Sequence, residues 1–255
     1  MLPTEFATRF KAGHELLGAF VKTPTSHAAE ILGGARFDFV VIDEEHAPID
    51  RAATDQILLG CRAGNIAGLV RVQSSAPSNI QSVLDCGANG VLVPHVASAE
   101  IARNVVSASR YRGGTRGFSN SPRAGGYGAT GMWPHIEAQD RDIAVLAMIE
   151  DREAIDVIDD ILGVSGLDGI FIGRGDLTVS LGAQNAGEPV VKDAVSRIMA
   201  AARKAGKPVC VMVGAVEDIA PFRSQGASAF IVSSDQGLLR TSAARIRADF
   251  SAAAN

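Results

Sequence analysis

The chain has 255 residues, 47% hydrophobic and 20% charged, which is typical of one large globular domain or two small ones. Its formal net charge of −4 at pH 7 provides no basic field for phosphate backbones or anionic lipid, so we expect neither a nucleic-acid partner nor a membrane partner. Three cysteines without a CxxC pair indicate neither a disulfide framework nor a zinc knuckle. The first residues lack the features of a signal peptide and no apolar run approaches a bilayer span, which predicts a cytoplasmic protein.

Short apolar runs alternate with stretches of helical periodicity along the whole chain. Each run is too short for a helix and too continuously apolar for a strand with one face in water, a pattern typical of buried parallel strands. The expected strands are Leu16–Phe20, Phe39–Ile42, Leu69–Val72, Val91–Val93, Ala144–Ile149, Gly169–Ile172, Val209–Val213 and Phe230–Val232. The expected helices between them include Ala52–Arg62, Ile80–Cys86, Ala99–Ser109, Arg152–Leu162, Lys192–Ala205 and Val216–Ser224.

This alternation predicts an α/β protein with right-handed crossovers. Eight such units in about 250 residues match the size of a (β/α)₈ TIM barrel, so we expect a single barrel domain over residues 1–255. A doubly wound sheet is the alternative, because the number of strands does not prove that the sheet closes.

The repeat is interrupted between Pro94 and Ala144 by a helix and the Gly-rich stretch 112–131. Loops of this length are usually functional or disordered. Arginines and the aromatic residues Phe118 and Tyr127 favour a segment that covers a substrate, and the alternative is a mobile surface loop. The end of the chain, Ala243–Ala254, is expected to form a helix whose apolar face docks on this subunit or on another one.

Polar residues follow the apolar runs at the ends where barrel enzymes carry their chemistry. The DEEH run that ends in His46 follows the second strand, and Arg71 ends the third. His95, Glu150 and Asp176 follow later strands. Two carboxylates, two histidines and an arginine would therefore meet at one rim of the barrel.

Each of these residues also has a purely structural interpretation. Glu150 and Asp176 precede helices, where carboxylates cap free N–H groups and favour the helix dipole. Arg71 could simply pair with Asp43, and His46 and His95 could be polar surface residues. Capping, however, requires no arginine or histidine on neighbouring strands, so their convergence favours a shared site.

Oxygen ligands from Glu150 and Asp176 suit a divalent ion such as Mg²⁺, Mn²⁺ or Co²⁺ better than zinc. Such an ion polarises a carbonyl and stabilises a developing enolate. Arg71 could donate to the same oxygen, and His46 is of the residue type that most often acts as a general base near neutral pH. Together these residues indicate proton abstraction next to a carbonyl.

Six separated segments, in order, resemble the HpcH/HpaI family of class II, metal-dependent pyruvate aldolases. They are FDFVVIDEEHAP (37–48), VRVQ (70–73), LDCGANGVLVPHV (84–96), YRGGTRG (111–117), VLAMIEDREA (145–154) and LDGIFIGRGDLTVSLG (167–182). The resemblance covers nearly the whole chain. It implies a (β/α)₈ barrel, commonly a homohexamer in which the C-terminal helix is exchanged between subunits.

The resemblance also implies roles for individual residues. Glu150 and Asp176 would hold the metal, and His46 would be the base that acts through a water. Asp85 matches a carboxylate that orients this histidine, often from a neighbouring subunit, and Arg71 matches the arginine on the pyruvyl oxygen.

The pyruvate carboxylate would be held by the backbone N–H groups of Gly175 and Asp176, since helix N-termini bind anions. Asp43 would support His46 or Arg71.

The chain departs from the family pattern at Glu44, His95, Met148 and Arg174. The family often has glycine, an apolar residue, glutamine and proline at these places. None of the departures removes a ligand or the base, but they leave the identity of the acceptor aldehyde open.

The implied reaction is reversible aldol cleavage of a 4-hydroxy-2-oxo acid to pyruvate and an aldehyde, with these small molecules as partners. Three alternatives remain at this point. They are citryl-CoA-type cleavage, a Schiff-base aldolase acting through Lys22, and a non-catalytic barrel that only binds pyruvate.

Overall fold

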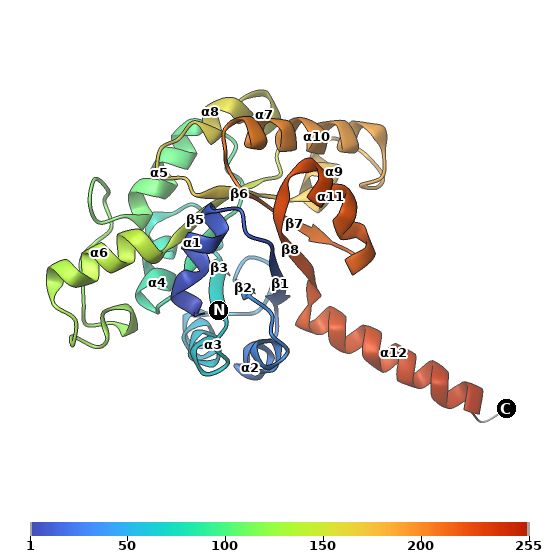
Figure 1. Ribbon diagram of the computed structural model, residues 1–255, viewed down its shortest axis with the longest axis horizontal. Coiled ribbons are helices and arrows are strands. Elements are labelled where there is room, and N and C mark those ends of the chain that lie inside the picture. Colours follow the sequence, from blue (N-terminus) through green and yellow to red (C-terminus); the bar gives the residue numbers. More distant parts are fainter. Residues whose placement is uncertain (1, 254–255) are drawn as a thin grey trace.

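Eight parallel strands form a closed barrel in the computed structural model, which describes residues 2–253 (Figure 1). They are β1 (Leu16–Val21), β2 (Phe39–Asp43), β3 (Ala67–Arg71), β4 (Gly90–Val93), β5 (Ala144–Ile149), β6 (Gly169–Ile172), β7 (Val209–Val213) and β8 (Ala227–Ser234). Each strand pairs with the next, and β8 pairs with β1. The predicted TIM barrel is confirmed and the doubly wound sheet is excluded. Residues 1, 254 and 255 of the predicted domain lie outside the described residues.

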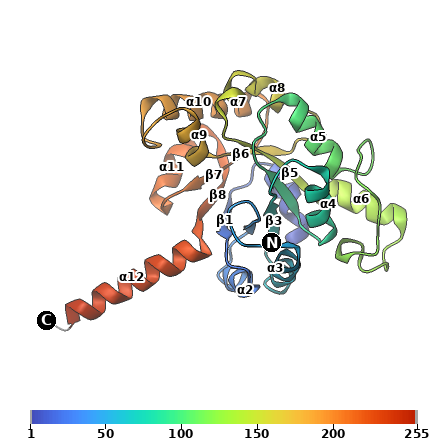
Figure 2. The same ribbon diagram turned by 180° about the vertical axis from the view of Figure 1, so that it is seen from behind.

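Helices surround this barrel on all sides (Figures 1 and 2). They are α1 (Phe6–Lys11), α2 (His27–Gly34), α3 (Arg51–Ala63), α4 (Pro77–Asp85), α5 (Ala99–Ser109), α6 (Met132–Asp142), α7 (Arg152–Asp156), α8 (Ile158–Leu162), α9 (Arg174–Ser180), α10 (Pro189–Lys204), α11 (Ile219–Gln225) and α12 (Asp235–Ala253). Short 3₁₀ turns are η1 (Pro3–Glu5), η2 (Arg123–Gly125) and η3 (Val216–Asp218). No helix among the described residues is long and apolar enough to cross a membrane.

The interior of the barrel is closed at the end where the strands begin. Phe6 and Phe10 of α1 are buried together with the first residues of β1, β2, β3 and β5. The ring of Phe6 lies 5.2 Å from that of Phe39. A Cβ on Gly169 would lie only 2.6 Å from Phe10, so a glycine lets α1 approach the barrel closely. A functional site can therefore form only at the opposite end of the barrel, where the strands finish.

The long segment between α5 and β5 lies at this closed end. α5 has already returned the chain to the amino ends of the strands, where Arg110 donates to the Ile143 carbonyl and pairs with Asp168 at 2.7 Å. Within one chain, the segment 112–131 therefore lies away from the carboxyl ends of the strands, and its role in covering a substrate stays a prediction. Helical periodicity located α5, but it did not show that the chain had already turned back.

The C-terminal helix α12 stands away from the barrel in both views (Figures 1 and 2). Its start is anchored because the Asp235 carboxylate accepts the N–H groups of Lys22 and Thr23. None of its described residues is buried, and Ile246 and Phe250 are 61% and 67% exposed. The helix predicted over 243–254 is present, although Asp235 begins it earlier and residue 254 lies outside the described part. It does not dock on its own barrel.

Candidate active site

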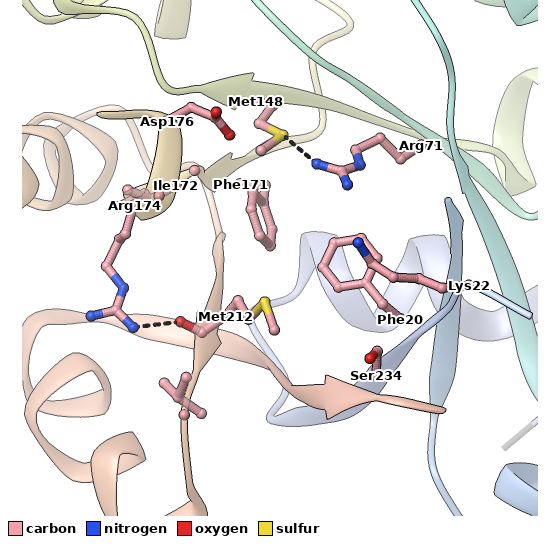
Figure 3. Close-up of a pocket in the computed structure, with 14 residues that line it drawn as sticks. Phe20, Lys22, Arg71, Met148, Phe171, Ile172, Arg174, Asp176, Met212 and Ser234 are labelled. Atoms are coloured by element: carbon pink, nitrogen blue, oxygen red, sulfur yellow. Dashed lines mark hydrogen bonds between the residues drawn. The ribbon is translucent and has the colours of Figure 1, made fainter. Parts of the chain in front are cut away.

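A cavity of about 500 Å³ opens where the strands end (Figure 3). It is lined from six strand ends and from the start of α9. The lining residues are Phe20, Lys22, Arg71, Met148, Phe171, Ile172, Gly173, Arg174, Gly175, Asp176, Met212, Val213, Gly214 and Ser234. The size and the mixture of apolar walls with a few charged groups are typical of a small-molecule site.

Asp43, the last residue of β2, organises the cationic side of this site. Its fully buried carboxylate accepts two hydrogen bonds from Arg71, at 2.9 and 2.8 Å, and pairs with Lys22 Nζ at 2.9 Å. Burial acts to raise the pKa of Asp43, but the hydrogen bonds from Arg71 and Lys22 outweigh it and lower the pKa to about 2. Asp43 therefore remains charged and holds both cations in place.

Arg71 faces the cavity while it remains paired with Asp43. Its guanidinium lies 5.0 Å from the centre of the Phe20 ring, and Nη1 lies 4.0 Å from the Met148 sulfur. Nη1 is also 3.1 Å from Glu45 Oε2. The structural pairing with Asp43 and the position at the cavity thus occur together, because a guanidinium offers donors on two sides.

Glu150, after β5, is a buried carboxylate with one free oxygen. Its Oε1 accepts the His95 backbone N–H at 2.9 Å, whereas Oε2 is buried and has no hydrogen-bond partner among the described residues. Burial raises the pKa of Glu150 to about 7, and the nearby charges of Asp176 and Glu45 add to the effect. A Cβ on Gly173 would lie 2.6 Å from Oε2, so only glycine leaves room for this carboxylate.

Asp176 lies in the first turn of α9 and is exposed at the cavity. Neither carboxylate caps a helix, because the N-cap residues are Asp151 for α7 and Gly173 for α9. A buried carboxylate oxygen without a partner is electrostatically costly, and a cation would remove that cost. Glu150 and Asp176 therefore fit a divalent ion. No cluster of three or more histidine, cysteine or acidic side chains that could hold a metal occurs in residues 2–253, so other ligands would complete its coordination.

The structure separates His46 from Asp85 within the chain. The His46 N–H donates to Asp43 Oδ1 at 3.2 Å, and its ring is 53% exposed near the same rim. Asp85 ends α4, which runs back toward the amino ends of the strands, and its carboxylate pairs there with Arg116 at 3.1 Å. A contact between His46 and Asp85 thus requires two subunits.

Glu45 is a site residue that the sequence reasoning missed. Besides Arg71, its carboxylate lies 3.7 Å from ring nitrogens of both His46 and His95. The sequence did carry a signal for Glu45, because side chains alternate between the two faces of a strand and this alternation continues past the end of β2. Asp43 and Glu45 therefore point to the site, whereas Glu44 points away from it and accepts a hydrogen bond from the Thr54 hydroxyl at 2.6 Å. Burial raises the pKa of Glu44.

His95 adopts a positive φ of 54°, and its backbone N–H donates to Glu150 Oε1 at 2.9 Å. Its ring is 60% exposed and lies 3.1 Å from the Asp151 carboxylate. Burial acts to lower the pKa of His95, but the acidic neighbours Asp151, Glu150 and Glu45 outweigh it and raise the pKa. His95 thus lies at the rim of the barrel where the strands end, and its backbone hydrogen bond helps to hold the Glu150 carboxylate in place.

A family model described as HpcH/HpaI aldolase/citrate lyase matches residues 16–242. The chain belongs to this family. It is therefore an aldolase-type lyase, and its homologues are class II aldolases that cleave a 2-oxo acid to pyruvate and an aldehyde. The family is known for dependence on a divalent metal, which agrees with the carboxylates of Glu150 and Asp176.

Individual relatives match over nearly the full chain. The 5-keto-4-deoxy-D-glucarate aldolase of Klebsiella pneumoniae is 33% identical over 249 residues, 96% of each chain. A solved HpcH/HpaI aldolase/citrate lyase family protein from Burkholderia cenocepacia superposes with a TM-score of 0.92 at 26% identity, covering 97% of this chain and 99% of that one. The solved citrate synthase SbnG has a TM-score of 0.88 at 32% identity, covering 98% of each.

Proposed function

We propose that this enzyme catalyses reversible retro-aldol cleavage of a 4-hydroxy-2-oxo acid, releasing pyruvate and an aldehyde. The observation that supports this most is a single cavity lined by the Arg71 guanidinium and the Asp176 carboxylate, with the buried Glu150 carboxylate packed directly against Gly173 in its wall. The names of relatives at about 33% identity, 5-keto-4-deoxy-D-glucarate aldolases, support the same reaction type.

Glu150 and Asp176 would hold Mg²⁺, Mn²⁺ or Co²⁺, which when bound polarises a carbonyl and stabilises enolate charge. Arg71 donates to the keto oxygen, where charge accumulates as the C3–C4 bond breaks. The N–H groups of Gly175 and Asp176 have no acceptor within the first turn of α9 and bind the substrate carboxylate. His46 removes the 4-hydroxyl proton through a water; the electron pair of C3–C4 passes to the pyruvyl half, and C3 then takes up a proton.

A Schiff-base mechanism through Lys22 is disfavoured by geometry. Its Nζ forms an ion pair with the buried Asp43 carboxylate at 2.9 Å, whereas a lysine that forms a Schiff base must attack as a neutral amine. The citryl-CoA-type alternative draws support from the neighbour named citrate synthase. A barrel that only binds pyruvate would not require a general base such as His46 at the rim.

The test is pyruvate release from a generic 4-hydroxy-2-oxo acid by protein stripped with a chelator, with each divalent ion restored separately. We expect activity only with a metal and none with Glu150→Gln. Pyruvate release that survives the chelator, together with covalent trapping by borohydride, would establish the lysine mechanism instead. Cleavage of a citryl thioester, but not of the 2-oxo acid, would establish the citryl-CoA alternative.

We propose in addition a homohexamer in which α12 is exchanged between subunits and Asp85 of one subunit orients His46 of another. The apolar side chains of α12 lack cover in one chain, and Asp85 lies at the opposite end of the barrel from His46. Mixing inactive His46→Ala and Asp85→Ala proteins under subunit exchange should restore part of the activity. Light scattering should give six chains, and Phe250→Glu should reduce that number. The cytoplasmic location remains a prediction.

A further inference from the structure

The buried ion pair between Arg116 and Asp85 leaves half of its carboxylate unused. Arg116 donates from Nη2 to Asp85 Oδ1 at 3.1 Å, and no hydrogen bond reaches Asp85 Oδ2 within residues 2–253. In the pair of Arg71 with Asp43, by contrast, Nε and Nη2 each bind one carboxylate oxygen. Arginine and a carboxylate frequently pair through two such parallel bonds, which give more energy than one. The single bond at Asp85 therefore leaves one oxygen for a donor from elsewhere.

Arg116 itself is held by contacts that do not involve Asp85. Its side chain is fully buried, and Nη1 donates to Gln139 Oε1 of α6 at 3.2 Å. Its guanidinium also lies 4.4 Å from the centre of the Tyr111 ring. The helix α4, which ends at Asp85, and α6 lie on the same side of the barrel (Figures 1 and 2). Because Arg116 is fixed by other parts of the chain, its bond limits the directions that the Asp85 carboxylate can take.

This arrangement costs free energy. Arg116 Nε is buried without a hydrogen-bond partner among the described residues, and a buried N–H without an acceptor is destabilising. A second bond, from Nε to Asp85 Oδ2, would remove that cost, but the chain does not form it. Proteins depart from such rules mainly at functional sites, so a role for Oδ2 outside its own subunit accounts for the observed geometry.

We propose that Arg116 is a positioning residue for the reaction, which holds Asp85 so that its free Oδ2 meets the ring of His46 on a neighbouring subunit. This inference rests on the proposed retro-aldol function and on the proposed pairing of Asp85 with His46. A carboxylate that accepts the N–H of a histidine fixes the orientation of its ring. Arg116 touches no reacting atom and acts only through Asp85, so without it the base is present but poorly aligned.

The first test is kinetic. Arg116→Met should lower kcat for pyruvate release by about ten- to a hundredfold, since a misplacement of about 1 Å can cost a hundredfold, and should leave KM for the 2-oxo acid unchanged. Arg116→Lys, which keeps the charge but loses the planar fork, should give an intermediate kcat. In an Asp85→Ala background, Arg116→Met should cause no further loss. Arg112→Met, at an arginine of the same segment whose side chain is 60% exposed, is the matched control and should keep the wild-type kcat.

The second test locates the defect within the assembly by mixing variants under subunit exchange. An Arg116→Met subunit still carries an intact His46, so mixing it with His46→Ala should restore part of the activity. Mixing it with Asp85→Ala should restore none, because both changes disable the same half of each shared site. If Arg116 only stabilised its own barrel, the pattern would be the reverse. Arg116→Lys serves for the same mixtures if Arg116→Met does not assemble.

The outcomes separate this inference from the proposals on which it rests. Wild-type kcat in Arg116→Met would overturn the inference while the aldolase function stands. So would a mixture of Arg116→Met with His46→Ala that stays inactive although His46→Ala and Asp85→Ala restore each other. If His46→Ala and Asp85→Ala do not restore each other, the pairing across subunits falls and the inference falls with it. A wild-type protein that releases no pyruvate would overturn the proposed function itself.

Discussion

Replacing Asp43 with asparagine should destabilise the fold and disorganise the cationic side of the site. Asp43 is fully buried and holds Arg71 and Lys22. Its pKa falls from 3.8 to about 2, and at 1.36 kcal/mol per pKa unit this corresponds to about 2 kcal/mol of stability at neutral pH. The remaining partner of Arg71, Glu45, limits the additional cost of an unpaired buried cation, so we expect a total loss of about 2–3 kcal/mol.

The sign of the pH dependence follows from the direction of this shift. A carboxylate whose pKa is lowered by folding stabilises the protein fully above its unfolded value of 3.8, and this contribution is lost as the pH falls to about 2. The gap in unfolding free energy between the wild-type protein and Asp43→Asn should therefore be constant from pH 7 to 5. It should narrow by about 2 kcal/mol between pH 4 and pH 2.

Urea unfolding of the metal-free proteins at one fixed protein concentration measures this gap. Asp193→Asn, at an exposed position of α10, is the matched control and should show no change in the gap with pH. A difference below about 0.5 kcal/mol at pH 7, or a gap that stays constant down to pH 2, would refute the assignment of Asp43 as a charged, buried anchor.

Three further predictions concern the site. Glu150→Gln and Asp176→Asn should each abolish Mn²⁺ binding in calorimetry while the circular dichroism spectrum is retained; near-normal affinity in either variant would contradict the two-carboxylate site. Arg71→Ala should lower kcat by about 10²–10³, and Arg71→Lys should also be poorly active because it lacks the planar fork; a rise in KM alone would assign Arg71 to substrate binding. Gly173→Ala should weaken Mn²⁺ binding, because its Cβ would lie 2.6 Å from Glu150 Oε2, whereas Gly34→Ala, where nothing lies within 4 Å, should not.

The strands could be predicted because each is a continuous apolar run that is buried on both sides, and all eight expected runs lie in the barrel. The short helices were harder. α1 and α2 were not expected from the sequence, since segments of six and eight residues carry little periodicity. The expected helix Arg152–Leu162 divides at Val157 into α7 and α8. Local patterns become less informative as elements shorten.

At the site, residues that directly end a strand could be predicted, and residues placed by contacts from elsewhere could not. Glu150 was expected at the rim, but its free buried oxygen depends on Gly173, which follows a different strand. Asp85 could be assigned a role only through the family resemblance. Its burial depends on a contact with Arg116, which lies 31 residues further along the chain.

The sequence by itself determined the class of fold and the residue types available for chemistry, because apolar periodicity and strand-end polar residues are local properties. Only the tertiary structure decided that the sheet closes, that the segment 112–131 lies at the end away from the site, and that α12 leaves its own barrel. It also decided that Glu45 faces the site while Glu44 turns to Thr54. These outcomes depend on contacts between residues far apart in the chain, and no local pattern encodes the direction from which such contacts come.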